Sequence, residues 1–387
     1  MKLDLNPYRL VPGLGTVCPF CLERIPRRRN LATCPHDGCH KELPALYMEP
    51  KTAIPHFPVQ VFGWKQHGKT AYLTALTLML MRMNNVWNRF TWAPVTEASQ
   101  RMVQAVNIHE REGSMPPSTP MGVDDCYVML LRKMEPWRDR SLLIRDCPGE
   151  AFEKFQVPLE QAPFLHRTRT LFMFISMPDL LDPEAENQRF EGRTMDMLMV
   201  GFLNTLQSHG VRLRGRRVVV VLSKADRIRN LPPGLRQYLV DDVLWAASSS
   251  PEPDRILRDF LPSGAAPTAQ AFMEKYLAAM AQNEEAIRQW LGRNNHAKNF
   301  IQLAQEYRVE LRFSLTSATG GQAVPGSGLT QRWEPRRVID PFFWALDMER
   351  RATFRARLAE LWSTAVAFAT RTKDGLTARS NASNPRL

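Results

Sequence analysis

The sequence predicts an α/β protein, a three-layer sandwich with a mostly parallel six-stranded sheet, preceded by a small zinc-binding module. Three observations lead to this prediction. Apolar, β-branched runs of strand length alternate with amphipathic helical stretches between residues 59 and 320, which is typical of a parallel sheet. A glycine-rich segment ending in Gly-Lys-Thr, residues 63–70, lies between a strand-like and a helix-like stretch. Four cysteines occur as two close pairs near the start of the sequence.

The composition is that of an ordinary globular protein with an excess of positive charge. The 387 residues are 44% hydrophobic, which suits one large domain with an appendage. The 51 Lys and Arg residues against 39 Asp and Glu give a formal net charge of +12, which favours anionic partners, and an arginine-rich surface explains it equally well. No stretch reaches the roughly 18 apolar residues of a membrane span, and the first residues lack a signal-peptide core. We therefore expect a cytoplasmic protein with reduced cysteines.

The N-terminal cysteines have the spacing of a structural zinc site. They are Cys18, Cys21, Cys34 and Cys39. A Cys-Pro-x-Cys turn directs both sulfurs to one side, and two such turns form a closed four-thiolate site for zinc. His36 and His40 are near enough in sequence to replace one cysteine, so this alternative stays open. The three arginines at 27–29 suit contact with nucleic acid or an acidic partner, or a solvated loop.

A proline-rich linker over residues 50–58 leads into the alternating strands and helices. The expected strands are residues 59–63, 126–133, 140–145, 170–176, 217–222 and 309–315. The run at 217–222, Arg217 followed by four valines and a leucine, is typical of a buried central strand. The runs at 126–133 and 140–145, separated by a short polar segment, predict a β-hairpin. Ligands of such sheets bind beyond the carboxyl ends of the strands, where we expect the functional residues.

The glycine-rich segment has the pattern of a phosphate-binding loop. Gly63 and Gly68 allow a tight turn in which backbone N–H groups surround phosphate oxygens. Lys69 would place a cation on the β- and γ-phosphates, and the Thr70 hydroxyl would complete a magnesium shell. The helix that follows, with Ala71 in its first turn, would direct its N-terminus at the phosphates. The alternative is an accidental glycine-rich turn between a strand and a helix.

Three further polar clusters follow predicted strands. Asp146 can hold the magnesium shell, and Gly149 can donate its N–H to a γ-phosphate. The strand at 217–222 leads into Ser223-Lys224-Ala225-Asp226, and the strand at 309–315 leads into Thr316-Ser317-Ala318. A carboxylate such as that of Asp226 is complementary to two adjacent donors on guanine, whereas adenine presents an acceptor at N1.

In this order, the motifs resemble those of the Ras-like GTPases of the translation-factor-related (TRAFAC) P-loop class. The resemblance covers residues 59–320 and extends to about 371. It implies that Asp226 accepts from guanine N1–H and the 2-amino group, that Lys224 lies along the base plane, and that the backbone N–H of Ala318 meets O6. The residues it assigns to the base-binding loops are Ser223, Lys224, Asp226, Ser317 and Ala318. Ser223 replaces the usual Asn or Thr, and its shorter side chain is expected to loosen the contacts between loops.

The switch and catalytic residues depart from the family pattern in one place. Thr119 is the expected switch threonine, which would bind magnesium only beside a γ-phosphate, and Ser118, Thr96 and Thr91 are alternatives. Glu150 stands where small GTPases commonly have a water-orienting Gln, and its charge is unfavourable near a γ-phosphate. Hydrolysis is therefore expected to be slow, or to need a partner residue such as an arginine finger, worth about 10³–10⁵ in rate. The expected catalytic residues are Lys69, Thr119, Gly149 and Glu150, and the expected magnesium ligands are Thr70, Thr119 and Asp146.

The predicted organisation is a zinc ribbon at 1–50, a GTPase domain at 51–371 and a disordered tail at 372–387. The GTPase domain would contain a helical insertion at about 227–305, with helices expected at 234–247, 269–282 and 283–305, and a closing helix from 338 to beyond 365.

A zinc ribbon joined to such a GTPase is similar to the double-GTPase families of bacterial conflict systems, which implies a second GTPase and regulated assembly. We expect a magnesium-dependent GTP/GDP switch that controls a protein effector or a second GTPase, with zinc in a structural role. The alternatives are a nucleotide-bound scaffold that does not hydrolyse GTP, and a GTPase that acts on nucleic acid or the ribosome.

Overall fold

The computed structural model describes residues 16–25, 31–48, 54–87, 89–112, 114, 126–134, 137, 139–147, 162–181, 193–262, 268–321, 323–324, 328–329 and 333–349. Residues 1–346 form one compact unit and residues 347–387 form a second. Thr119, Gly149, Glu150 and the predicted tail lie outside the described residues. The predicted domain boundaries stay predictions.

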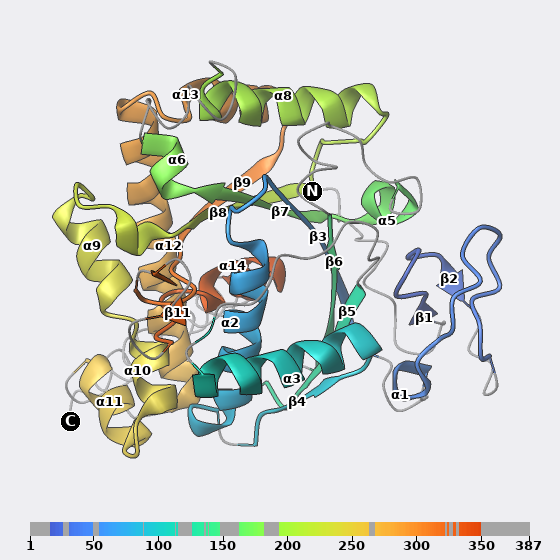
Figure 1. Cartoon of the computed structure of the whole chain (residues 1–387), viewed down its shortest axis with the longest axis horizontal. Helices are drawn as coiled ribbons and strands as arrows, with labels where there is room; N and C mark the ends of the chain where they lie inside the picture. Colours follow the sequence, from blue (N-terminus) through green and yellow to red (C-terminus); the bar gives the residue numbers. More distant parts are fainter. Residues whose placement is uncertain are drawn as a thin grey trace, which may run out of the picture. The chain divides into compact units, whose positions relative to one another are not determined.

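A mixed seven-stranded sheet in the order β4-β5-β6-β3-β7-β8-β9 forms the centre of the first unit (Figure 1). Its strands are β3 (His56–Gly63), β4 (Thr91–Pro94), β5 (Cys126–Arg132), β6 (Arg140–Asp146), β7 (Thr170–Ser176), β8 (Arg217–Ser223) and β9 (Glu310–Leu315). β6, β3, β7, β8 and β9 are parallel, whereas β5 is antiparallel to β6 and β4 is antiparallel to β5. The mostly parallel α/β sheet and the β5–β6 hairpin are confirmed, and β4 is an edge strand that the sequence did not predict.

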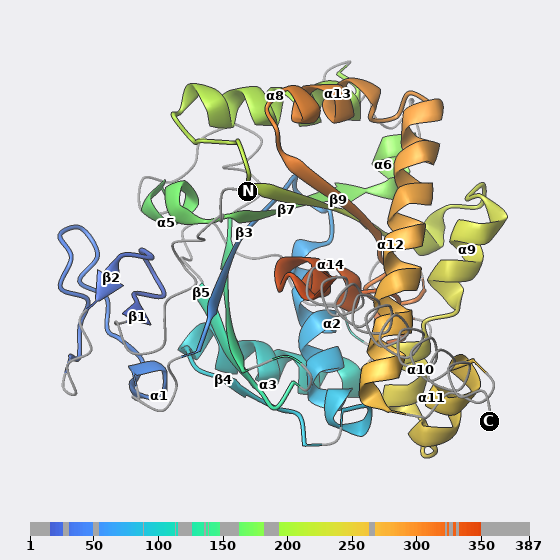
Figure 2. The same cartoon turned by 180° about the vertical axis from the view of Figure 1, so that it is seen from behind.

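Helices cover both faces of the sheet (Figures 1 and 2). α2 (Lys69–Arg82), α3 (Glu97–Glu112) and α14 (Ile339–Ala345) lie on one face. α5 (Ala162–Arg167), α8 (Met195–Ser208) and α13 (Lys298–Glu306) lie on the other. Alternation along β7 separates the faces, because Phe172 and Phe174 contact the ring of Tyr72 on α2 while Met173 joins the cluster beneath α8.

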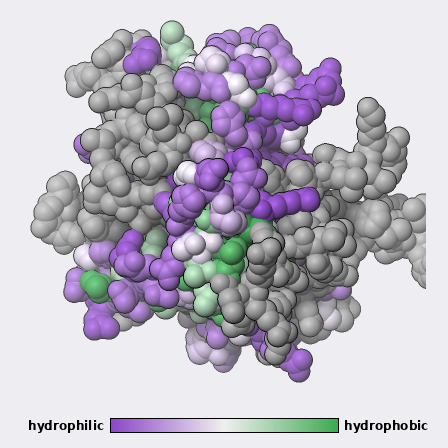
Figure 3. All heavy atoms as spheres, turned by 90° about the vertical axis from the view of Figure 1, so that its right-hand side faces the viewer, coloured by the Kyte–Doolittle hydropathy of each residue, from purple (hydrophilic) through white to green (hydrophobic). Residues whose placement is uncertain are grey.

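The N-terminal module has β1 (Thr16–Val17) paired with β2 (Arg24–Ile25), followed by α1 (Ala45–Met48). Val17, Leu22 and Tyr47 of this module pack with Val128 of β5 and Leu143 of β6 in one buried cluster. Figure 3 faces the side on which the module lies in Figure 1, where the described atoms are largely hydrophilic with a smaller hydrophobic patch among them. The module is anchored to the sheet by apolar packing, and its exposed residues include the polar Arg24, Asp37, His40 and Glu42.

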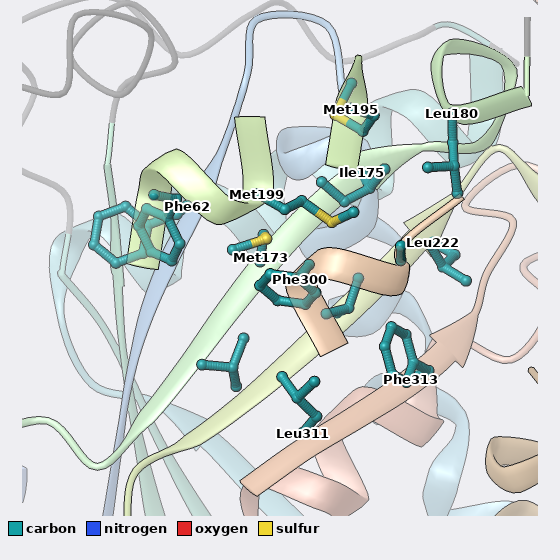
Figure 4. Close-up of a cluster of buried hydrophobic side chains, with 14 of the residues drawn as sticks. Phe62, Met173, Ile175, Leu180, Met195, Met199, Leu222, Phe300, Leu311 and Phe313 are labelled. Carbon is teal, nitrogen blue, oxygen red and sulfur yellow. The ribbon is translucent and has the colours of Figure 1, made fainter. Parts of the chain in front are cut away.

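The core beneath α8 and α13 is large and continuous (Figure 4). Met195 and Met199 of α8 and Phe300 of α13 lie over Met173 and Ile175 of β7, all at most 1% exposed. Burying each such side chain contributes about 1.5–3 kcal/mol to the stability of the fold. The packing of α8 and α13 therefore holds β7 and its neighbours in place, and with them the polar residues at the ends of these strands.

The helical insertion differs in its boundaries from the prediction. Its helices are α9 (Pro233–Val240), α10 (Val243–Ser249), α11 (Pro253–Phe260), α12 (Ala269–Arg293) and α13. The single helix expected at 234–247 is wrong, because Asp242 interrupts it and caps α10 by accepting from the Trp245 N–H at 3.0 Å. The boundary expected at 282/283 is also wrong, because a buried stripe continues from Met280 through Ile287. α14 ends at Ala345, a turn follows at 346–347, and residues 348–349 are helical again; the remainder of the predicted closing helix, to beyond 365, lies outside the described residues.

Shorter elements complete the described part of the chain. They are η2 (Met83–Asn85), α6 (Met177–Leu181), η4 (Ala225–Arg227) and the hairpin of β10 (Ala323–Val324) with β11 (Gly328–Leu329). Among the described residues, none of the helices has the length and apolar character needed to cross a membrane.

Candidate nucleotide site and four-cysteine cluster

The glycine-rich loop connects β3 to α2, and both of its glycines are required by their surroundings. A Cβ on Gly63 would lie 2.7 Å from the Cβ of Phe174 on β7, so a larger residue would push these strands apart. Gly68 has φ +83°, a left-handed conformation that favours glycine. Lys69 is 9% exposed, and its ammonium donates to the carbonyl of Gly63 at 2.7 Å. The lysine therefore curls over the mouth of the loop, where a phosphate would replace the carbonyl as its partner.

The loop is fixed from below by His67, a residue that the sequence analysis did not single out. The imidazole is fully buried, with Nδ1 2.9 Å from the carbonyl of Phe174 and Nε2 3.0 Å from the carboxylate of Asp179. The main-chain carbonyl of His67 accepts a hydrogen bond from Ser223 Oγ at 2.7 Å. The phosphate loop is thus tied to β7, α6 and the end of β8. The signal in the sequence was a histidine at a position of the glycine-rich loop where the motif accepts any residue.

Asp146 ends β6 beside the loop. It is 2% exposed and pairs in register with Val61 of β3. Burial, and to a lesser extent the Asp146 charge, raises the pKa of the adjacent Cys147 thiol to about 12, while Lys69 and Arg145 oppose this shift. Cys147 therefore stays a neutral thiol. The N–H of Cys147 donates to the carbonyl of Val61 at 3.0 Å, which holds the end of β6 against the strand that leads into the phosphate loop.

The two predicted base-binding loops lie next to each other at the ends of β8 and β9. The N–H of Ala225 donates to the carbonyl of Thr316 at 3.1 Å, which joins the loops directly. Lys224 adopts a left-handed φ of +56°, and Asp226, in η4, is partly buried. Ser317 is fully buried, and its Oγ accepts from the N–H of Gly320 at 2.9 Å. Ala318, next to it, is partly exposed.

Ser223 makes the connection that its length put in doubt. Its hydroxyl donates to the carbonyl of His67 in the phosphate loop at 2.7 Å and lies 3.3 Å from the carbonyl of Ile175 on β7, while the expected loosening of the contacts between loops stays a prediction.

The predicted residues that the structure describes lie at the ends of β3, β6, β8 and β9. The predicted switch and catalytic residues beyond Lys69 lie outside the described residues. Thr119, Gly149 and Glu150 stay predictions. Of the alternatives to Thr119, Thr96 is buried and donates to the carbonyl of Cys126 at 2.7 Å, which gives it a structural role. Thr91 is exposed at the start of β4.

Comparison with known sequences gives the family. A sequence model of the Double-GTPase 2 family matches residues 58–252, just over half of the chain and the stretch that holds the phosphate loop, Asp146 and the Ser223–Asp226 loop. The chain belongs to the Double-GTPase 2 family. The predicted resemblance to P-loop GTPases and to double-GTPase families is confirmed, and the protein is a GTP-binding GTPase at the level of its family. None of the curated proteins compared with it matches.

Solved structures with similar chain traces include two translation-factor-like proteins. The Ski7 GTPase-like domain of S. cerevisiae, bound to GDP and inorganic phosphate, is 12% identical with a TM-score of 0.35, and the match covers 76% of this chain and 50% of that one. Sup35 complexed with GDP is 12% identical with a TM-score of 0.25, and the match covers 69% and 38%. This GTPase therefore spans half or less of the length of these two solved chains.

In this Double-GTPase 2 protein, the four N-terminal cysteines converge as their spacing predicts. Their sulfurs all lie within 4.8 Å of one another, and two of the pairs, Cys18–Cys39 and Cys21–Cys34, are 3.8 Å apart. Sulfurs about 2.3 Å from one tetrahedral zinc ion would be about 3.8 Å apart, so the cluster fits zinc. The Phe20 N–H also points at Cys18 Sγ, 3.4 Å away, which would stabilise a thiolate.

The histidine alternative does not apply to this cluster. Among the described residues, the sulfur cluster consists of cysteines alone. His36 places its Nε2 2.7 Å from the carbonyl of Arg24, so its ring braces β2, and His40 is exposed.

Proposed function

We propose that this GTPase is a magnesium-dependent switch that binds and hydrolyses GTP and controls a protein partner through its nucleotide state. The observation that carries the proposal is that Lys69, Asp146 and the Ser223–Asp226 loop follow the carboxyl ends of β3, β6 and β8 in one parallel part of the sheet, with a hydrogen bond joining Ser223 to the phosphate loop. Ligands of parallel α/β sheets bind at this edge. The hydrogen bond from Ser223 to His67 supports one continuous pocket for phosphates and base.

Each predicted residue has a role in this proposal. Backbone N–H groups from Gly63 to Ala71 surround the phosphates, and Lys69 neutralises the β- and γ-phosphates. Asp226 and Lys224 recognise guanine, with Ser317 and Ala318 supporting the base from the adjoining loop. Magnesium, when bound, would neutralise charge on the phosphates, and its side-chain ligands would be Thr70, Asp146 and Thr119.

The partner and the hydrolysis rate belong to the same proposal. The family name favours a second GTPase as partner. We place the switch in a cytoplasmic regulatory or defence system of a bacterium, as the resemblance to the double-GTPase families implies. Gly149 would donate its N–H to the γ-phosphate, and Glu150 would direct the attacking water poorly because of its charge. Hydrolysis would therefore be slow until a partner supplies a further cation.

Binding of fluorescent guanine nucleotides with magnesium tests the site. Lys69→Ala should remove GTP binding, whereas Lys298→Ala, which removes an exposed lysine at the start of α13, should leave it unchanged. Asp226→Asn should shift preference from GTP to XTP, because the amide N–H₂ donates to the xanthine oxygen. Unchanged GTP affinity in Lys69→Ala, or retained guanine preference in Asp226→Asn, would contradict the proposed site.

A non-hydrolysing scaffold is the second candidate, and Glu150 is the residue that favours it. Single-turnover assays with radiolabelled GTP, with and without a candidate second GTPase, separate the two functions. Tight GTP binding with no phosphate release under either condition would support the scaffold. Release that rises when the partner is added would support the switch.

A further inference from the structure

Three consecutive carbonyls of the first cysteine turn accept hydrogen bonds from the GTPase domain. Cys126 Sγ of β5 donates to Pro19 O at 3.2 Å, and Arg145 Nη1 of β6 donates to Phe20 O at 2.7 Å. Arg167 Nη1 of α5 donates to Cys21 O at 3.3 Å. We call residues 18–21 the zinc knuckle. These hydrogen bonds fix the backbone between Cys18 and Cys21, the two cysteines of the knuckle.

The Arg145 contact is buried and strong. The residue is 1% exposed, and its guanidinium carbon lies 5.7 Å from the ring centroid of Phe164 on α5. Hydrogen bonds from charged donors are shorter and about twice as strong as neutral ones, and more so away from water. Arg167 adds an ion pair with Glu23, just beyond the knuckle.

Arg145 is also joined to the nucleotide site through its own strand. It directly precedes Asp146, and the alternation of a β-strand directs the two side chains to opposite faces of the sheet. The carbonyl of Arg145 accepts from Gln60 Nε2 at 3.1 Å, and Cys126 is its cross-strand neighbour. A shift of Asp146 on metal and nucleotide binding would therefore be passed along β6 to the guanidinium that holds Phe20.

The contact between the knuckle and α5 is only partly apolar. Phe164 of α5 belongs to the apolar cluster that holds the module against β5 and β6, whereas a cavity of about 1000 Å³ opens between the knuckle and His166 and Arg167 of the same helix. The cavity is lined in part by Cys21, Cys39, His166 and Arg167. Polar contacts across such a cavity can change without disrupting a packed core.

We propose that Arg145 and Arg167 are positioning residues that couple the zinc knuckle to the nucleotide site. Each nucleotide state then sets a different affinity of the four cysteines for zinc, and zinc changes nucleotide affinity by the same factor, since coupling between two binding sites is reciprocal. The inference rests on the proposed binding of GTP and zinc by this chain.

Zinc release to a chromogenic chelator tests the coupling in the full chain. Release is measured without nucleotide, with GDP and with a non-hydrolysable GTP analogue, after zinc content and nucleotide binding have each been measured separately. We expect zinc affinity to differ between nucleotide states by about 5-fold or more, within the usual range of allosteric coupling. Removal of zinc should change nucleotide affinity by a matching factor.

Two substitutions identify the residues responsible. Arg145→Gln and Arg167→Gln should bind zinc with the same stoichiometry and lose the difference between nucleotide states, and Arg167→Lys should restore part of it. Arg288→Gln is the matched control, because Arg288 also pairs with a glutamate and a carbonyl, Glu284 and Leu311 O, and does so away from the knuckle. If Arg145→Gln fails to fold, the Arg167→Gln variant alone tests the coupling, because Arg167 is partly exposed and its substitution disturbs the core less.

The outcomes separate this inference from the proposed function. Equal zinc release in all nucleotide states, from a chain that binds both zinc and guanine nucleotide, would overturn the coupling and leave the proposed function intact. Coupling retained in both glutamine variants would overturn the assignment to these arginines. A wild-type chain that binds no guanine nucleotide would overturn the proposed function, and the coupling with it.

Discussion

A buried carboxylate at the junction of three helices makes the stability of the fold depend on pH. Asp340 of α14 is 1% exposed and accepts hydrogen bonds from the hydroxyls of Tyr276, at 2.5 Å, and Tyr238. Burial raises its pKa from the usual 3.8 to about 6, while the Arg337 charge and the two tyrosine hydrogen bonds oppose this shift. The perturbation that isolates this group is Asp340→Asn, which keeps the shape of the side chain and removes its titration.

The magnitude and sign of the effect follow from the two pKa values. Because the pKa is higher in the folded state, the folded protein binds more protons between the two values, so unfolding becomes easier as the pH rises. The stabilisation is complete below the unfolded-state value of 3.8 and is lost as the pH passes through about 6. The full change is about 3 kcal/mol, of which about 2 kcal/mol falls between about pH 4.5 and pH 7.5.

Urea denaturation of both chains across this pH range is the assay. The free energy of unfolding of Asp340→Asn, minus that of the wild type, should rise by about 2 kcal/mol from about pH 4.5 to pH 7.5. Taking the difference cancels the titration of all other groups that the substitution does not touch. Parallel profiles would refute the reasoning, because they would show that Asp340 does not titrate in this range in the folded state.

Two further predictions concern the phosphate loop. Gly63→Ala should lower stability by about 1–3 kcal/mol and weaken GDP binding, because its Cβ would clash with Phe174. Gly234→Ala in α9, with no atom within 4 Å of the added Cβ, should not lower the thermal midpoint, and equal losses in the two variants would contradict the clash. Ser223→Ala should cost about 1–3 kcal/mol in urea denaturation, because the buried carbonyl of His67 loses this donor, and Ser223→Thr should retain most of the stability. If Ser223→Ala matches the wild type in both stability and GDP affinity, that hydrogen bond does not hold the loop.

The elements that the sequence predicted are those with a strong local pattern. The run at 217–222 is apolar from Val218 onward and became β8, an inner strand between β7 and β9. β4 escaped prediction because Trp92, Ala93 and Pro94 show neither alternation nor β-branching, and the strand exists through its pairing with β5. The break at Asp242 was missed for a related reason, since the apolar period continues across it and only the capping side chain marks the boundary.

The parts of the site that could be predicted from the sequence are those in which a residue type has one characteristic role, such as cysteine in a zinc site. Cysteine spacing predicted the sulfur cluster, and the Gly-Lys-Thr string predicted the loop. The uses of arginine were not predictable, because composition does not distinguish a surface guanidinium from one that caps buried carbonyls. Five arginines are buried among the described residues, namely Arg140, Arg145, Arg216, Arg217 and Arg337. Part of the positive charge thus stabilises the interior and is not offered to an anionic partner.

The form of the sheet edges has a consequence for how this protein behaves in a crowded solution. An exposed edge strand offers unpaired N–H and C=O groups on which a strand of another molecule can assemble. β4 is four residues long and ends in Pro94, which has no N–H to offer, so it is a poor template for a growing cross-β stack. At the opposite edge, α12 runs beside β9 (Figure 2). We therefore expect the folded chain to resist aggregation through its sheet edges, despite a sheet of seven strands.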